Sequence, residues 1–509
     1  MPFTDEEKAG RIFALQHPFY TQNIATWKRN KAAYDGGRRY LKTALIKHLA
    51  EFQEEYAERL KRAYYFNFPR KVIRLLTQYV LSVRPQRKDA DSSLCEDFNR
   101  SGQSVDEIMR QFSIDLRLYG VAFLQVDMPC FAGIPTKARE QKERLRPYCF
   151  VPSPESVKAW AYGSDGKLLW ICTEESLYCQ EDPFTDGQNI LQRKLWTRQD
   201  CTIARKDADG KYTLSGYFEH NLGIVPFVRR TEADGYAIGS SHWFEDIVGI
   251  SDAILNNESE AQMNIVKQMF ALLVLPEDFV SAARARIQDL TDSDSLMDEK
   301  REDYIKKQLD LVIARGVAIT ESTESKGTSR YITPPGVEIE KISDKNSHLI
   351  KQLYALCCLA TDKDTKLVES ADAKMWDFQA IEQHLATHAD MLENAEAEAW
   401  KIMQCWKKSL PVPDLNYNRN FTVLQLTESI SALLELYGMN QDSKTYQQEC
   451  GKAALSMLGR IRQMPQDIVE KILKEIESAT VEKIPPSNGN WPYQEPEEGK
   501  EDVDDPVIR

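Results

Sequence analysis

Two long stretches of uninterrupted helical periodicity constrain this chain more than any other feature. From His242 to Leu275, apolar residues recur at helical spacing for about 34 residues without a proline, and a similar run extends from Ala373 to Lys408, before Pro411 and Pro413. At 1.5 Å per residue each run predicts a rod of roughly 50 Å, well beyond the average globular helix. Helices of this length need a role that requires length.

A further helix is predicted between the two rods, from Ser343 to Ala360. Its apolar residues fall on a common stripe, as expected of a helix with one buried face: Leu349, Ile350, Leu353, Leu356 and Leu359. The polar, charged segment from Thr361 to Asp372 separates this helix from the rod that follows.

The region before the first rod contains two kinds of sequence pattern, the first helical and the second typical of strands. From Trp27 to Lys88 it is basic and aromatic, with 16 Lys or Arg against 5 acids, and predicts helices with a turn at Gly36-Gly37. The apolar residues of this region follow helical spacing: Tyr56, Leu60, Ala63, Tyr64, Val72, Leu75, Leu76, Tyr79 and Val80. This spacing favours their burial in a core over a role in stacking on nucleic-acid bases. An amphipathic helix is predicted from Ser104 to Tyr119, followed by a strand.

Between about Pro147 and Arg230 the period changes to that of strands. Short segments rich in β-branched and aromatic residues alternate with Asp-Gly turns at Asp165-Gly166, Asp186-Gly187 and Asp209-Gly210. The predicted strands are Tyr148 to Val151, Leu168 to Thr173, Leu195 to Thr197, Tyr212 to Phe218 and Ile224 to Arg229. The fold class is therefore α+β and mostly helical, with one β-rich subdomain.

Toward the carboxyl end the pattern is mixed. A strand is predicted at Phe421, and helices are predicted from Ser429 to Tyr437, Tyr446 to Leu458 and Gln466 to Ser478. From about Pro485 onward the chain is rich in Pro, Glu and Asp, and residues 485–509 should be a disordered acidic tail.

Composition excludes several classes of protein. The net charge of −13 argues against a surface designed to grip nucleic acid, although it is compatible with a conduit along which DNA slides. No stretch is long and apolar enough to be a signal peptide or a membrane span, so the protein should be soluble and intracellular. The ten cysteines include no CxxC pair and are expected to be reduced, mostly buried thiols.

No enzyme signature is present in the sequence. It lacks GxxxxGK[ST], GxGxxG after a strand, and GxSxG, so we expect neither catalysis nor a cofactor. The closest approach to a metal site is His384 and His388, at i and i+4. HLATH lacks the glutamate of HExxH and has no evident third ligand, so ordinary polar or buried histidines are the favoured interpretation.

The order of the parts resembles the portal proteins of tailed bacteriophages over nearly the whole chain. YDGGRRYL at Tyr34 to Leu41, the segment from Tyr56 to Pro85, and GIVPFVRR at Gly223 to Arg230 are similar to the wing of that family. SADAKMWDFQAIEQHLATHADMLENAEAEAWK, which begins at Ser370, is similar to its tunnel helix. Each motif alone is only moderately specific for this family, but their order along the chain is more specific for it.

The resemblance implies a portal fold with wing, stem, clip and crown regions. It assigns residues 1–241 to the wing, including the β-rich part at about 147–230, residues 242–276 to the first stem helix, 277–339 to the clip, 340–360 to the second stem helix, 361–372 to the tunnel loop, 373–410 to the long tunnel helix and 411–484 to the carboxyl-terminal wing and crown. It further implies a ring, usually of roughly twelve subunits, at one capsid vertex of the virion, assembled in the host cytoplasm.

The same resemblance implies the contacts of such a ring. Double-stranded DNA would pass through without sequence readout, touching the tunnel-loop residues Asp362, Lys363, Asp364, Lys366 and Glu369. The charged clip would meet the large subunit of terminase and later the head-completion or adaptor proteins, while the major capsid protein and, where one exists, a scaffolding protein would surround the ring. No membrane partner is implied. The basic region from Trp27 to Lys88 could contact DNA or the capsid wall; simple surface solubility explains it equally well.

Two other classes stay open at this point. A minor head or adaptor protein without a channel would lack the long paired helices. A nuclease would carry a metal-bound acidic cluster and lose activity with chelators. A solvated connection between two helices is the plain alternative for residues 361–372.

Overall fold

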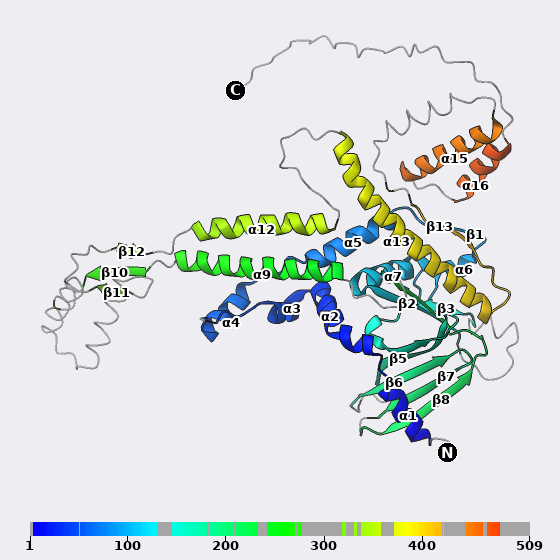
Figure 1. The fold of residues 1–509 in the computed structure, drawn as a ribbon, viewed down its shortest axis with the longest axis horizontal. Coiled ribbons are helices and arrows are strands. Elements are labelled where there is room, and N and C mark those ends of the chain that lie inside the picture. The colour runs from blue at the N-terminus through cyan, green and yellow to red at the C-terminus, as the bar shows by residue number, and fades with distance from the viewer. Residues whose placement is uncertain are drawn as a thin grey trace, which may run out of the picture. The chain divides into compact units, whose positions relative to one another are not determined.

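The computed structural model describes most of the chain (Figure 1). The described residues are 4–49, 51–129, 145–180, 186–207, 209–232, 242–269, 272–276, 318–321, 330–332, 337–357, 371–419, 443–461 and 466–478, with the single residues 184, 285 and 421. The chain divides into two compact units, Met1–Phe421 and Thr422–Arg509.

Helices dominate the first part of the larger unit. The turn predicted at Gly36-Gly37 is confirmed, because Gly36 ends one helix and precedes the next at a φ of 68°, a value that suits glycine. The helices are α1 Asp5–Ala14, α2 Pro18–Asp35, α3 Gly37–Ala44, α4 Gln53–Arg62, α5 Phe68–Val80, α6 Ser92–Glu96 and α7 Val105–Tyr119.

Helix α7 forms the centre of the main core. Ser104 and Glu107 make a reciprocal capping box at its start, and Gly120 ends it in the left-handed conformation, so both predicted ends are confirmed. Most of its side chains are buried. The strand β2 Val121–Asp127 follows at once, and its first six residues are also buried. A strand covered on both faces is nearly continuously apolar rather than alternating, and in VAFLQV only Gln125 is polar.

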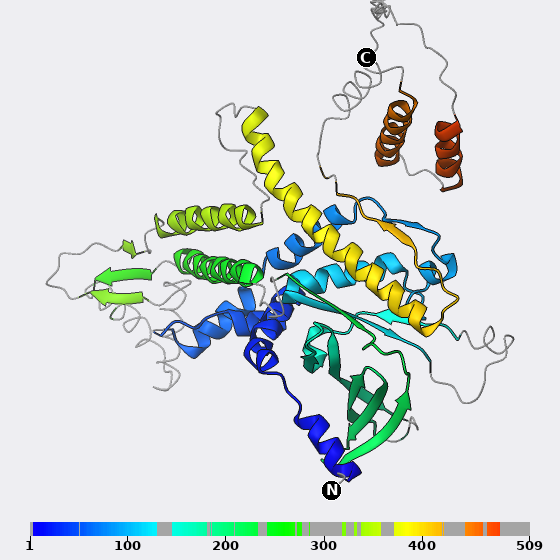
Figure 2. The same cartoon turned by 45° about the vertical axis from the view of Figure 1, so that its right-hand side comes forward.

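Strand β2 is the middle of a three-stranded antiparallel sheet. It pairs with β3 Tyr148–Phe150 on one side and with β9 Phe227–Thr231 on the other. Helix α13 Ala371–Trp406 lies across β2, β9 and α7, as Figures 1 and 2 show. The largest buried side chains of this core include Trp27, Phe112 and Trp400.

The predicted β-rich subdomain is confirmed as a five-stranded antiparallel meander. Its strands follow chain order: β4 Val157–Tyr162, β5 Leu168–Cys179, β6 Gln188–Thr197, β7 Asp200–Lys206 and β8 Tyr212–Glu219. The turns contain Gly166 and Gly210 at positive φ. The strand predicted at Leu195 is longer than expected, and β4 and β7 were not expected. Helix α1 packs on this sheet, where Arg193 donates hydrogen bonds to the carbonyls of Ile12, Phe13 and Leu15.

The rod predicted from His242 to Leu275 is shorter than expected. Helix α9 spans His242–Met269, and the last residues of the predicted rod instead form the strand β10 Leu272–Pro276. This strand pairs with β11 Ala318–Glu321 and β12 Arg330–Ile332. The run LLVL is apolar at every position, so periodicity alone could not distinguish a helix from a buried strand.

The other two long helices are confirmed with shifted ends. Helix α12 spans Val337–Leu356, beginning before the expected position and ending at the residue before the buried Cys357. Residues 337–339, assigned to the clip from the sequence, are therefore the first turn of α12. Helix α13 has 36 residues, which corresponds to roughly 54 Å. Strands β1 Gln86–Lys88 and β13 Asp414–Asn416 form a small antiparallel pair beside it.

The smaller unit contains two described helices, α15 Lys444–Ile461 and α16 Gln466–Ser478. Both were expected, α16 with these bounds. Gly451 lies so close to α16 that a β-carbon there would come within 3.2 Å of Ile476, so the two helices pack tightly. The strand expected after Phe421, the helix at 429–437 and the acidic tail at 485–509 lie outside the described residues.

Two aromatic residues do not follow the predicted core stripe. Tyr64 lies beyond the end of α4 and is 42% exposed, and Tyr79 on α5 is 43% exposed. Their stripe neighbours Ala63, Val72, Leu76 and Val80 are buried, as predicted.

Candidate functional site

The five residues proposed to face DNA lie outside the described part of the chain. Asp362, Lys363, Asp364, Lys366 and Glu369 all fall within residues 358–370, between the end of α12 and the start of α13. Residues 371 and 372, assigned to the same loop, are the first two of α13. The helices that flank this segment, α12 and α13, belong to the described residues, and the DNA contact stays a prediction.

Helices α9 and α12 lie side by side in both views (Figures 1 and 2). Leu353 of α12 is fully buried and belongs to the same core cluster as Ile247 and Val248 of α9. Farther along, buried Asn346 accepts from Asn257 Nδ2 at 2.8 Å and donates to Glu258 Oε1 at 2.5 Å. A buried amide with its hydrogen bonds satisfied favours one register of the two helices over its neighbours.

Helix α13 is anchored by a buried carboxylate. Glu396, which is 0% exposed, receives two hydrogen bonds from the Arg87 guanidinium at 2.6 and 3.0 Å. Trp400 Nε1 and Tyr417 Oη donate to the same carboxylate, and Arg87 also contacts Asp106 at 2.7 Å. Burial alone would lower the pKa of Arg87, but the hydrogen bonds and charge of Glu396 raise it. This network joins α13 to β1, α7 and β13.

The two histidines considered as metal ligands are instead joined to α7. His388 Nε2 lies 2.9 Å from Ser113 Oγ, and His384 Nε2 lies 3.1 Å from Arg117 Nη1. Burial, reinforced by the charge of Arg117, lowers the pKa of His384 to about 4 and that of His388 well below its usual value. Both rings are therefore neutral near pH 7 and hold α13 against α7. Among the described residues, no cluster of three His, Cys, Asp or Glu side chains could hold a metal ion.

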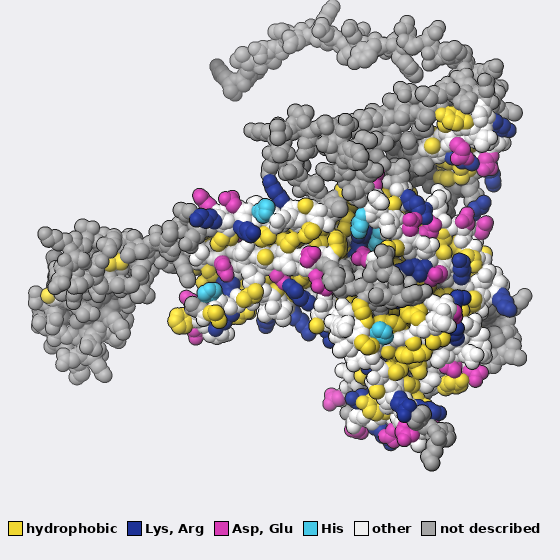
Figure 3. Space-filling model, in the orientation of Figure 1, with side chains coloured by type: hydrophobic (Ala, Val, Ile, Leu, Met, Phe, Trp, Pro, Cys, Tyr) yellow, Lys and Arg dark blue, Asp and Glu magenta, His cyan; other side chains and the backbone are white. Residues whose placement is uncertain are grey.

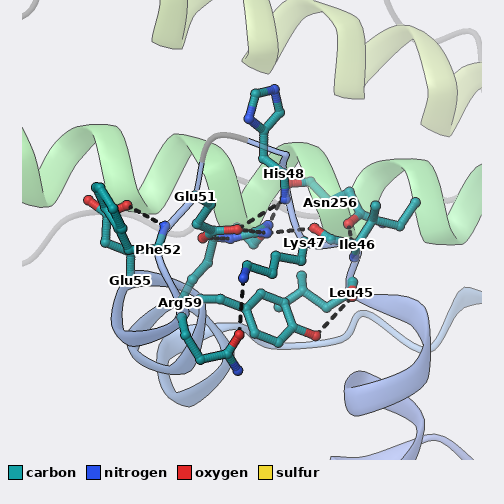
Figure 4. Close-up of polar contacts among 12 residues, drawn as sticks. Leu45, Ile46, Lys47, His48, Glu51, Phe52, Glu55, Arg59 and Asn256 are labelled. Atoms are coloured by element: carbon teal, nitrogen blue, oxygen red, sulfur yellow. Dashed lines mark hydrogen bonds and ion pairs between the residues drawn. The ribbon is translucent and has the colours of Figure 1, made fainter.

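A second polar cluster holds the α3–α4 hairpin on α9 (Figure 4). Arg59 is 3% exposed and pairs with Glu51 at 2.8 Å. It also donates to the carbonyl of Ile46 at 2.6 Å and to Ser259 Oγ on α9 at 2.9 Å. Asn256 of α9 accepts from the backbone nitrogen of Ile46 at 2.9 Å. The loop between α3 and α4 is thus bound at its backbone to the middle of α9.

Apolar packing supports the same attachment. Leu41, Leu45 and Ala63 of the hairpin form a small buried cluster with Leu255 of α9. The loop itself, however, points three large apolar side chains outward: Ile46 is 70% exposed, Leu49 is fully exposed and Phe52 is 73% exposed. Figure 3 shows hydrophobic side chains at the surface over α4 and along α9 and α12.

The basic character of this region is confirmed at the surface. Exposed cations lie on three successive helices and their connections: Arg38, Arg39, Lys42, Lys47, Lys61, Arg62, Lys71 and Arg74. Several are also engaged with the protein, since Arg38 donates to the carbonyls of Leu60 and Lys61, and Lys61 pairs with Glu58 at 2.8 Å.

The residues that position these helices could not be found from the sequence. Arg59 and Ser259 are separated by 200 residues, and Arg87 and Glu396 by 309. A charged residue inside an amphipathic pattern is the one available signal, because an arginine or glutamate on a buried stripe must find a partner. Nothing in the neighbouring sequence indicates which distant residue that partner is.

Comparison with known proteins gives little. No family model matches the sequence. No curated protein matches it either. Among solved structures, the chain is similar to the neck of an empty GTA particle computed with C6 symmetry, at 10% identity and a TM-score of 0.36, over 79% of this chain and 88% of that one. It is also similar to the neck of a native GTA particle computed with C12 symmetry, at 10% identity and a TM-score of 0.40, over 82% and 98%.

At scores and identities this low we draw no functional conclusion from either likeness. Within the described residues, none of the helices has the length and apolar character that crossing a membrane would need. Of the eight described cysteines, five are buried.

Proposed function

We propose that this chain is a portal protein, a subunit of a ring that conducts double-stranded DNA into and out of a phage capsid. The observation that carries the proposal is the succession of α9, a three-stranded sheet, α12 and α13. It is the same order as the first stem helix, clip, second stem helix and tunnel helix in the family that the sequence resembles. The role requires no catalysis by this chain and no cofactor.

The physical properties of the helices suit this role. Paired helices whose register is fixed by a buried amide, such as α9 and α12, form a stiff element that can stand beside identical copies. Heterologous contacts between copies close into a ring when the rotation between them divides the circle. The 78 acidic side chains outnumber the 65 basic ones and give a net charge of −13, which favours sliding of DNA over tight binding of its phosphates.

The partners follow from the same proposal. The segment between α9 and α12 would meet terminase during packaging and head-completion proteins afterwards, and the outer surface would meet the major capsid protein. The basic helices α3 to α5 would face packaged DNA or the capsid wall, and the phosphates of DNA would attract their exposed lysines and arginines.

Ring formation is the first test. We expect the purified chain to form annular particles with a central hole in negative-stain images, and native mass spectrometry to give an integral multiple of 58.4 kDa near twelve subunits. A monodisperse monomer or dimer at every concentration would instead favour a minor head or adaptor protein.

The lysines between α12 and α13 give the second test. Replacing both Lys363 and Lys366 with alanine should leave the ring intact and change packaging yield or DNA retention, because each lost phosphate contact reduces the salt dependence of DNA binding by about one unit of slope. The matched control replaces Lys471 and Lys474, two exposed lysines at the same spacing on α16. Equal packaging and retention in both double variants would contradict the proposed contact.

A further inference from the structure

The exposed apolar side chains of the α3–α4 loop lack a partner within the described part of this subunit. Isolated exposed apolar residues are common, but three large ones within seven residues of one loop are unusual. The loop is also anchored at Ile46, whose backbone is bound to both Asn256 and Arg59. A loop that is fixed in place and yet shows its apolar side chains to solvent is suited to docking.

The opposite flank of α9 offers a complementary surface. Ser259 and Asn256 of α9 contact the hairpin, whereas Asn257 contacts Asn346 of α12. Both ribbon views show α9 between the hairpin on one side and α12 on the other (Figures 1 and 2). A head-to-tail contact needs two different surfaces on opposite flanks, so that each copy can use one surface toward each neighbour.

One exposed stripe of α12 carries side chains that could cover the apolar residues of the loop. Lys341, Lys345, His348 and Leu356 are exposed and follow helical spacing along one stripe. Ile342 is partly exposed one turn before Lys345. Lysine stems and these apolar side chains can cover the loop's apolar side chains while the ammonium groups stay in water.

Charge complementarity points the same way. The first turn of α4, directly after the apolar loop, carries exposed Glu54. The α12 stripe carries Lys341 and Lys345, with exposed Glu340 and Asp344 at its edge. Opposite charges at the rim of an apolar contact select the partner and its orientation more than they add affinity.

We propose that the loop residues Ile46, Leu49 and Phe52 of one subunit pack on the exposed face of α12 of the next, with Glu54 facing Lys341 or Lys345. This inference rests on the proposed ring and names the surfaces that would join its subunits. The contact is heterologous, and it places the hairpin of each copy against the helix pair of its neighbour.

The first experiment compares assembly of the full chain with that of the double variant Leu49→Asp, Phe52→Asp. We expect the variant to need at least about tenfold more protein for half assembly, because charged groups would be desolvated in the contact. The control is Tyr217→Asp, at a tyrosine that is 60% exposed on β8 and should assemble as the unmodified chain does. Circular dichroism checks that each variant is folded.

The second experiment does not depend on a disruptive variant. A photo-crosslinking amino acid at position 52, in rings mixed from unlabelled and nitrogen-15-labelled subunits, should give crosslinks between subunits to peptides within residues 337–357. A Glu54→Lys substitution should weaken assembly, and Lys345→Glu in the same chain should restore part of it.

The outcomes separate this inference from the proposed function. If the unmodified chain forms rings and Leu49→Asp, Phe52→Asp forms them equally well, with crosslinks elsewhere, the docking surface is wrong and the ring stands. Crosslinks from position 52 to a different protein or to the capsid would also overturn it. If the unmodified chain forms no ring at any concentration, the portal proposal fails, and the docking proposal fails with it.

Discussion

Replacing Glu396 with alanine is expected to lower the free energy of unfolding of the larger unit by about 3–5 kcal/mol. The carboxylate is 0% exposed and accepts hydrogen bonds from Arg87, Trp400 and Tyr417. Its removal leaves the Arg87 guanidinium, whose side chain is only 6% exposed, as a buried charge with one remaining carboxylate neighbour. Chemical denaturation followed by tryptophan fluorescence measures the loss.

A second glutamate on the same helix supplies the control. Glu398 also pairs with an arginine, Arg230, at 3.0 Å, but its side chain is 49% exposed. Ion pairs in water contribute little, so Glu398→Gln should change the free energy of unfolding by less than about 1 kcal/mol. If the two variants were equally stable, the buried network would not anchor α13 as described.

The substitution Asp115→Asn is expected to stabilise the protein at pH 8 and to have almost no effect at pH 4. Burial raises the pKa of Asp115 to about 7, although Gln111 donates a hydrogen bond to it at 2.8 Å. A carboxyl whose pKa is raised on folding stabilises the folded state below its unfolded pKa, and this contribution is lost as pH rises through about 7. The gain of Asp115→Asn at pH 8 should be on the order of 3–4 kcal/mol.

Comparing Asp115→Asn with the unmodified chain separates the pH dependence due to Asp115 from that due to the buried histidines. His384 and His388 have lowered pKa values, so they contribute stability above pH 6.5 that is lost as the pH falls toward 4, with or without the substitution. The difference between variant and unmodified chain therefore reports Asp115 alone. Urea denaturation at a series of pH values measures it, and a constant difference from pH 4 to pH 8 would rule out the raised pKa.

Glu107, on the same helix, should give the opposite sign. Hydrogen bonds from the backbone and side chain of Ser104 lower the pKa of Glu107. Its contribution is therefore present above its unfolded pKa and is lost as the pH falls. Glu107→Gln should destabilise the protein at pH 8 and converge with the unmodified chain at low pH.

Local chemistry determined much of the secondary structure. The capping box at Ser104 and the left-handed Gly120 set both ends of α7, and the Asp-Gly pairs set turns of the meander, because these features need only neighbours in the sequence. The length of α13, 36 residues, could be predicted from the helical spacing of its apolar residues and from Pro411 and Pro413, which come after it. The proposed DNA contacts at 362–369 also came from the sequence, and they remain predictions.

The tertiary structure decided what depends on distant partners. Helix α9 ends at Met269 because LLVL finds two strands to pair with, one more than 40 residues onward and one nearly 60, and an apolar run has no intrinsic preference strong enough to choose. Arg59 and Glu396 hold helices in place only in the folded chain, which brings Ser259 next to Arg59 and Arg87 next to Glu396. No prediction from the sequence covered the side chains of Ile46, Leu49 and Phe52. Their exposure follows from the tertiary structure, because hydrogen bonds attach the loop backbone at Ile46 to Asn256 of α9 and to Arg59.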